Sequence, residues 1–207
     1  MSNINKKGIV LVISSPSGAG KTTICKKLTN EVDGINLSVS VTTRKKRKEE
    51  IHGKHYFFKN EYEFKKLIKQ NEFLEHANVF GNLYGTLKNE VVSKINNGTD
   101  VIVDIDWQGT RQIEKHLPQD IVKVFILPPS MKELESRLGK RASESKENFI
   151  KRMSEAKKEI SHYNEYDFVI VNKEIKHAVE QIKLILFSER LRKHRQNSLK
   201  KTLEKLL

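Results

Sequence analysis

Apolar residues gather in four short segments, 9–14, 101–104, 122–127 and 168–171, and none of these segments alternates strictly with polar residues. Continuous runs of branched apolar side chains are typical of strands that are buried on both faces of a parallel sheet. The first run ends at a cluster of Ser, Pro and Gly, which favours a turn. The pattern therefore predicts buried parallel strands, the first of which leads into a tight loop.

Between these strands, apolar residues recur at the three- and four-residue spacing of a helix face. The positions are Ile24, Leu28 and Val32; Met131, Leu134 and Leu138; Phe149, Met153, Ala156 and Ile160; and Ile175, Ala178, Val179, Ile182, Ile185 and Leu186. Alternation of buried strands with amphipathic helices predicts an α/β fold, in which helices cover an open parallel sheet.

Residues 36–88 show a different pattern. Short mixed segments at 38–42 and 55–58 and a helical segment at 61–69 are followed by aromatic residues and glycines around 81–85. We predict that this stretch is a small α+β subdomain, inserted into a core domain made of residues 1–35 and 89–207. No internal repeat or low-complexity linker is visible.

The composition narrows the class of protein. With 207 residues, 37% of them hydrophobic, the chain is long enough for one sizeable α/β domain. The single cysteine, Cys25, excludes an intrachain disulfide and a cysteine-rich metal site, and it fits a reducing cytoplasm. No segment approaches the roughly 20 apolar residues needed to cross a bilayer, and the run at 9–13 is too short for the core of a secretory signal.

The formal net charge of +13 leaves three kinds of partner open: nucleic acid, a membrane surface, or a polyanionic small molecule. Residues 188–205, called the tail below, hold seven Lys and Arg against two Glu, and a second basic run occupies 44–48. We interpret the tail as a solvated helical face. No recognisable nucleic-acid-binding module accompanies the charge, which disfavours a nucleic-acid partner.

A phosphate-binding loop is predicted at residues 15–22, because this glycine-rich segment follows a strand and opens a helix. Gly18 and Gly20 let the backbone turn its N–H groups toward phosphate oxygens, and the next helix presents its positive end to the same anion. Lys21 can neutralise a transferred phosphate, and the Thr22 hydroxyl can bind Mg²⁺. The general pattern begins with glycine, and Ser15 stands there in this chain. By itself the loop leaves kinase, ATPase and GTPase open.

A second anion site is indicated by two arginines three residues apart, Arg44 and Arg47, with Tyr56 nine residues beyond the second. Guanidinium forks hold phosphate oxygens in a bidentate way that lysine cannot match, and the tyrosine hydroxyl adds a third donor. These groups together suit a pocket of monophosphate size.

The spacing of residues 43–58 resembles the signature of the guanylate kinase family: Thr-Arg, two residues, Arg, two residues, Glu, two residues, Gly, two residues, Tyr, one residue, Phe. Residues 71–75, Asn-Glu-Phe-Leu-Glu, and 104–109, Asp-Ile-Asp-Trp-Gln-Gly, are similar to two further family elements. The resemblance spans about residues 9–190. It implies a P-loop NTPase three-layer fold with a parallel central sheet, an inserted GMP-binding subdomain and a helical lid at about 137–152.

The resemblance also implies the activity of a nucleoside monophosphate kinase, which transfers a phosphoryl group from ATP to GMP with Mg²⁺, giving ADP and GDP in purine nucleotide metabolism. The positions that match ATP contacts are Ser15, Pro16, Ser17, Gly18, Ala19, Gly20, Lys21, Thr22, Thr23, Arg137, Arg141 and Asn172, with Thr22 on the metal. The positions that match GMP contacts are Ser40, Arg44, Arg47, Tyr56, Glu75, Tyr84, Thr86, Asp104 and Asp106, with Glu75 on the guanine base. The positions that match catalytic residues, which stabilise the transferred charge, are Lys21, Arg137, Arg141 and Arg152.

Several alternatives stay open at this stage. A guanylate-kinase-like interaction domain would keep the fold and bind a peptide, although such domains typically lose part of the phosphate loop or the acceptor set. A nucleoside monophosphate kinase with another acceptor is the nearest alternative within the class. The expected partners are ATP and GMP, or dGMP in its place, with no membrane, in a monomer or a homodimer. Ala142 stands where many family members have glycine, so the backbone geometry of the turn in the lid is not predicted. The separate roles of Asp104 and Asp106 are also left open.

Overall fold

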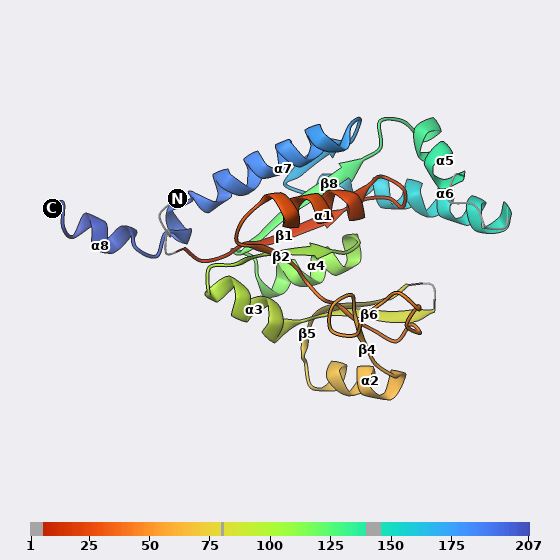
Figure 1. The fold of residues 1–207 in the computed structure, drawn as a ribbon, viewed down its shortest axis with the longest axis horizontal. Coiled ribbons are helices and arrows are strands. Elements are labelled where there is room, and N and C mark those ends of the chain that lie inside the picture. Colours follow the sequence, from red (N-terminus) through yellow and green to blue (C-terminus); the bar gives the residue numbers. More distant parts are fainter. Residues whose placement is uncertain (1–5, 80, 140–145) are drawn as a thin grey trace.

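The computed structural model describes residues 6–79, 81–139 and 146–207, and its main body is a parallel sheet in the order β2-β7-β1-β8-β9 (Figure 1). The strands are β1 (Val10–Ser14), β2 (Ile35–Leu37), β7 (Asp100–Asp104), β8 (Ile121–Leu127) and β9 (Phe168–Val171). The four strands predicted from apolar runs are confirmed as strands. Their predicted burial on both faces is wrong for β9, an edge strand on which Val169 and Val171 are exposed. Strand β2 escaped prediction because it is short and only its first residue is buried.

Helices cover both faces of this sheet (Figure 1). Helices α1 (Lys21–Glu31) and α7 (Ile175–Arg190) pack on one face, and α3 (Lys88–Asn96) and α4 (Trp107–His116) pack on the other. Alternate residues of β1 pack on opposite faces of the sheet. Leu11 and Ile13 pack with α1 and α7, and Val10 and Val12 pack with α3 and α4. The predicted three-layer α/β fold is confirmed.

A second sheet lies beside the first, in the order β4-β3-β6-β5 (Figure 1). Its elements are β3 (Val41–Thr42), β4 (Phe57–Phe58), α2 (Glu61–Lys69), β5 (Phe73–Val79) and β6 (Asn82–Leu87). Phe64 of α2 stacks on Phe73 of β5 to form its small core, with ring centroids 4.7 Å apart. This sheet lies within the predicted 36–88 insertion, but Asn36 and Leu37 belong to β2 of the main sheet. The division into two domains remains a proposal.

Two further helices, α5 (Met131–Gly139) and α6 (Lys146–Ile160), pack against each other next to the phosphate loop (Figure 1). A Cβ added at Gly18 would lie 3.1 Å from side-chain carbons of Leu134 and Leu138. The loop and α5 are therefore in close contact, and this contact leaves no room for a larger residue at Gly18. The short 3₁₀ helix η1 (Tyr163–Glu165) then leads into β9.

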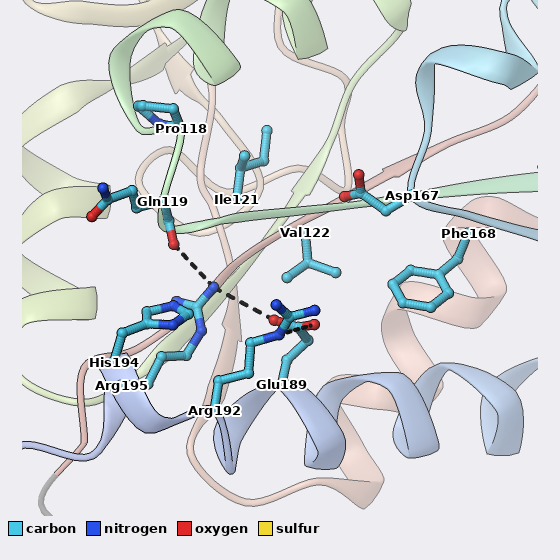
Figure 2. Close-up of a pocket in the computed structure, with 10 residues that line it drawn as sticks. All are labelled: Pro118, Gln119, Ile121, Val122, Asp167, Phe168, Glu189, Arg192, His194 and Arg195. Carbon is cyan, nitrogen blue, oxygen red and sulfur yellow. Dashed lines mark hydrogen bonds and ion pairs between the residues drawn. The ribbon is translucent and has the colours of Figure 1, made fainter.

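The prediction of a solvated tail is wrong for its first half. Arg195, in the 3₁₀ helix η2 (Lys193–Arg195), is only 2% exposed, and its Nη2 donates to the carbonyl oxygen of Gln119 at 3.2 Å (Figure 2). Arg190 donates through Nε to Oδ2 of the buried Asp100 at 2.7 Å. Helix α8 (Leu199–Leu203) has no buried residue, so the solvated description holds there. A charge count does not register buried partners, so these contacts could not be predicted from it.

In the part of the chain that the structure describes, every helix is too short or too polar to cross a bilayer.

Candidate nucleotide-binding site

The predicted phosphate loop lies between the end of β1 and the start of α1. Gly18 and Gly20 have φ angles of 89° and 101°, in the left-handed region that glycine adopts without strain. A cavity of about 250 Å³ opens over the loop. Its lining residues are Ser15, Pro16, Ser17, Gly18, Gly20, Lys21, Thr22, Thr23, Asp104 and Glu159. The structure thus brings the predicted loop residues around one cavity, apart from Ala19, which is buried beneath them.

Lys21 points from the start of α1 toward the end of β7. Its Nζ lies 2.5 Å from Oδ1 of Asp104 and donates to the carbonyl oxygen of Ile105 at 3.3 Å. Burial lowers the pKa of Lys21, but the charge of Asp104 and its hydrogen bond outweigh this effect and raise the pKa above its usual range. The lysine therefore stays protonated and directed into the cavity.

Asn172 lies under the phosphate loop. The side chain is 1% exposed, and its Nδ2 donates to the carbonyl oxygen of Ala19 at 2.7 Å. A Cβ added at Gly20 would lie 2.6 Å from the same Nδ2. In this structure Asn172 holds the loop backbone through Ala19, and the contact to ATP that the resemblance implies stays a prediction.

A second cavity, of about 240 Å³, adjoins the first under the smaller sheet. The cavity over the phosphate loop is called the loop cavity below, and this second one is called the acceptor cavity. Its lining residues are Lys21, Ser40, Tyr56, Glu75, Ala77, Val79, Tyr84, Asp104, Ile105, Asp106 and Glu159. Six of the nine residues predicted to contact GMP line this cavity. It shares Lys21, Asp104 and Glu159 with the loop cavity. Two predicted nucleotide sites therefore meet at the same three side chains.

Glu75 on β5 is the buried carboxylate of this second cavity, at 4% exposure. Burial raises its pKa to about 7, although the hydroxyl of Thr86 donates to Oε1 at 2.6 Å and favours the charged form. Gly109 of α4 makes room for it, since a Cβ there would lie 2.9 Å from Oε2 of Glu75. This glycine allows the carboxylate to lie against the helix.

The two signature arginines occupy different surroundings. Arg44 is partly buried, with Nη2 2.6 Å from Oε1 of Glu50 and its guanidinium carbon 5.4 Å from the centre of the Tyr56 ring. Hydrogen bonds from Arg44 and from the Arg47 backbone N–H lower the pKa of Glu50 to about 2. The Arg47 side chain is exposed. The structure therefore brings Arg44 and Tyr56 together and leaves Arg47 at the surface.

The two aspartates that the sequence left unresolved have separate contacts. Asp104 ends β7 and pairs with Lys21 on the side of the phosphate loop. Asp106 is the N-cap of α4, where Oδ1 accepts the backbone N–H of Gly109 at 2.9 Å. Asp106 lines the acceptor cavity but not the loop cavity.

Two of the three arginines that the resemblance assigns to the lid, Arg137 and Arg152, lie among the residues that the structure describes. Arg137 donates through Nε to Oε1 of Glu133 at 2.8 Å on α5. Arg152 on α6 lines a third cavity, of about 440 Å³, together with Ser17, Asp106 and Glu159. Arg141 lies outside the described residues.

Glu159, near the end of α6, is a site residue that the sequence reasoning missed. It lines the loop cavity, the acceptor cavity and the third cavity. Burial raises the pKa of its carboxyl to about 7, with Asp106 and Glu155 adding to this effect while Lys21 and the Ser17 backbone N–H oppose it. The available signal was a charged residue on the apolar helix face that contains Ala156 and Ile160.

The loop that precedes α1, with a second cavity meeting it at Lys21, defines a P-loop nucleotide-binding protein of the α/β class. Comparison with known proteins gives the family. Residues 7–189 match the family model described as guanylate kinase. The chain belongs to the guanylate kinase family, as the resemblance of residues 43–58 predicted.

Individual relatives match the sequence of this chain along nearly its whole length. The guanylate kinase of Hyphomonas neptunium is 45% identical over 203 residues, which is 98% of this chain and 94% of the relative. That of Maricaulis maris is 49% identical over 190 residues, covering 92% and 87%. The crystal structure of guanylate kinase from Anaplasma phagocytophilum superposes with a TM-score of 0.80 at 37% identity, covering 98% of this chain and 96% of that one.

Proposed function

We propose that this chain is a nucleoside monophosphate kinase that transfers the terminal phosphoryl group of ATP to GMP, giving ADP and GDP. The observation that carries the proposal is the meeting of two cavities at Lys21 and Asp104, one over a phosphate loop and one over the buried Glu75. Family membership supports the same pair of substrates. The donor phosphates would lie on the loop, and the acceptor phosphate would approach from the side of Arg44 and Tyr56.

Phosphoryl transfer requires two anionic nucleotides to be brought in line and their mutual repulsion to be cancelled. The protonated Lys21 supplies positive charge where the cavities meet. Arg137 and Arg152 lie on the two helices beside that point, and Arg141 is expected to join them. These four residues are therefore the proposed catalytic residues, and no general base is needed.

Magnesium fits the oxygen donors of the loop cavity. Thr22 and Asp104 both line it, and the described residues contain no group of three or more His, Cys, Asp or Glu side chains that could hold a metal by themselves. Mg²⁺ is usually held by one or two protein oxygens together with substrate phosphates, so a sparse protein contribution is expected. When bound with ATP, the ion would neutralise charge on the donor phosphates, with Thr22 as its proposed protein ligand.

The acceptor base is proposed to be guanine because of Glu75. Guanine presents N1–H and N2–H₂ side by side as donors, and one ionised carboxylate accepts both. Adenine has an unprotonated N1 at this position and would leave the buried carboxylate unpaired. Sites of this kind can discriminate by about 10⁴ or more.

A coupled assay for ADP release from Mg²⁺-ATP tests the proposal, with GMP, dGMP, AMP, CMP and UMP as acceptors. Turnover with the guanine nucleotides alone is expected, and Glu75→Gln should lose most of the preference for GMP over AMP. If a folded protein releases no ADP with any of these acceptors, the peptide-binding alternative is favoured. If turnover is fastest with a nucleotide of another base, that nucleotide is the acceptor. A cytoplasmic location and the choice between monomer and homodimer stay predictions.

A further inference from the structure

The carboxyl group of Glu159 lies at the wall of the cavity over the phosphate loop, beside the proposed site of the donor phosphates. It lines the cavity over the phosphate loop together with Ser17 and Lys21, and both of these residues favour its charged form. Its Oε2 is buried and has no hydrogen-bond partner among the described residues. A carboxylate beside a loop N–H and the loop lysine presents the same chemistry as a phosphate oxygen.

The helix that carries Glu159, α6, begins within the lid predicted at about 137–152. Ala156 packs with Leu134 and Leu138 of α5, and these two leucines contact the phosphate loop at Gly18. Arg152 lies two turns before Glu159 and lines the same third cavity. A displacement of α6 away from the loop would therefore move Glu159 and Arg152 together.

Charge makes this arrangement incompatible with a bound donor. The loop cavity has a volume of about 250 Å³, and the carboxylates of Asp104 and Glu159 both line it. Asp104 is paired with Lys21 at 2.5 Å, and the same lysine also favours the charged form of Glu159. Phosphates that enter would repel Glu159 strongly in such a partly desolvated space.

We propose that Glu159 is a positioning residue whose carboxylate lies against the phosphate loop until donor phosphates displace it, and that this exchange couples donor binding to the position of α6. The inference rests on the proposed function, because it requires the donor nucleotide to bind at the loop. Glu159 takes no part in the chemical step. Its role is to contact the phosphate loop before the donor binds and to convert donor binding into movement of α6.

Equilibrium binding of Mg²⁺-ADP and of GMP, measured separately by calorimetry, tests the exchange. Glu159→Gln keeps the shape of the side chain and removes its charge. At about pH 8.5, where a carboxyl with a pKa of about 7 is ionised, it should bind ADP at least about fivefold more tightly than wild type, at the low end of usual coupling energies. GMP affinity and the thermal midpoint should stay close to wild type. Glu155→Gln is the matched control, since it removes the same charge one turn earlier on α6, and it should leave ADP affinity within about twofold.

The two proposals fail in different ways. A wild-type protein that binds neither ADP nor GMP would overturn the proposed function. A wild-type protein that binds both, with a Glu159→Gln variant that binds ADP equally or more weakly, would overturn the exchange alone. Equal tightening in Glu155→Gln would show a general charge effect and would also overturn it.

A second measurement uses the wild-type chain and does not depend on any variant. Trp107 is the only tryptophan in the sequence, and its ring stacks on His162 just beyond α6, with centroids 3.7 Å apart. Lys158, the neighbour of Glu159, lies 5.9 Å from the centre of the same ring. Saturating ADP should change the emission of Trp107 if α6 moves. Unchanged emission at saturation would contradict the coupling.

Discussion

The ammonium group of Lys21 lies 2.5 Å from Oδ1 of Asp104, which joins the first turn of α1 to the end of β7. The two residues come from strands that are neighbours in the parallel sheet, β1 through its loop and β7 directly. Because the carboxyl ends of parallel strands share one edge, the lysine of the phosphate loop and the aspartate meet there. Asp104 keeps Lys21 extended over the cavity before any nucleotide is bound.

Replacement of this lysine should separate folding from catalysis. We expect Lys21→Met to fold and to lose about 3 kcal/mol or more of transition-state stabilisation, roughly a hundredfold in kcat, by comparison with the loss of one oriented donor. Steady-state kinetics with Mg²⁺-ATP and GMP measures the loss. Lys27→Met removes a half-exposed lysine from the same helix and should be close to wild type. A Lys21→Met enzyme that keeps most of its kcat would refute the assignment.

Arg44 offers a test of the acceptor site that is independent of the donor site. Arg44→Ala should weaken GMP binding by about ten- to a hundredfold, the usual value of a charge-assisted hydrogen bond to phosphate, and change ATP binding by less than about threefold. Calorimetric titration of each nucleotide measures both effects. Lys46→Ala, an exposed charge two residues away, is the matched control. Equal losses for both nucleotides would mean that Arg44 does not belong to a separate acceptor pocket.

The fold was predictable where burial leaves a pattern in the sequence. Apolar runs identified β1, β7 and β8 because both faces of each strand are covered, and the same kind of run identified β9 although Val169 and Val171 on one of its faces are exposed. Periodicity identified α1, α5, α6 and α7. Strand β2 has two exposed residues out of three and carries no such pattern. Its place beside β7 follows from the topology of the complete sheet.

The site was predictable where its residues are adjacent in sequence. The phosphate loop and the spacing from Arg44 to Tyr56 are local motifs, and they located both cavities. The contact of Asn172 with Ala19 and the position of Glu159 join segments about 140 residues or more apart in the chain. Such contacts depend on how β9 and α6 pack, which no local spacing records.

Gly109 sets the space available to Glu75. Gly109→Ala should fold, because alanine is the better helix former, but its Cβ would push Oε2 of Glu75 from a position 2.9 Å away. We expect GMP affinity to fall about tenfold or more while ADP affinity is kept. Gly139→Ala adds a methyl group where no atom lies within 4 Å and serves as the control for GMP affinity. Unchanged GMP binding by Gly109→Ala would show that Glu75 does not need this position.

The buried carboxyl of Glu75 should make stability depend on pH. Its pKa is about 7 in the folded protein against 4.5 for an ordinary glutamate, so between these values the folded state binds more protons than the unfolded state. The free energy of unfolding of the ligand-free protein should therefore fall as pH rises from about 4.5 to 7. Glu75→Gln should remove this contribution, which is of the order of 3 kcal/mol at most. Urea unfolding at pH 5 and pH 8 measures it, and parallel losses in the two proteins would contradict the prediction.

The tail should divide into a part that stabilises the core and a part that does not. Truncation after Ser188 removes Arg190, the partner of the buried Asp100, and Arg195, which is 2% exposed. Lys6 remains at 2.7 Å from Asp100, but one carboxylate oxygen loses its charged donor, and we expect a loss of about 3 kcal/mol or more in unfolding free energy. Truncation after Asn197 removes only the exposed segment with α8 and should change that energy by less than about 0.5 kcal/mol. Urea unfolding of both truncations against the full chain makes the comparison. Equal stability of all three proteins would show that the buried arginines are not needed to hold the fold, and a large loss after Asn197 would place the stabilising contacts in α8.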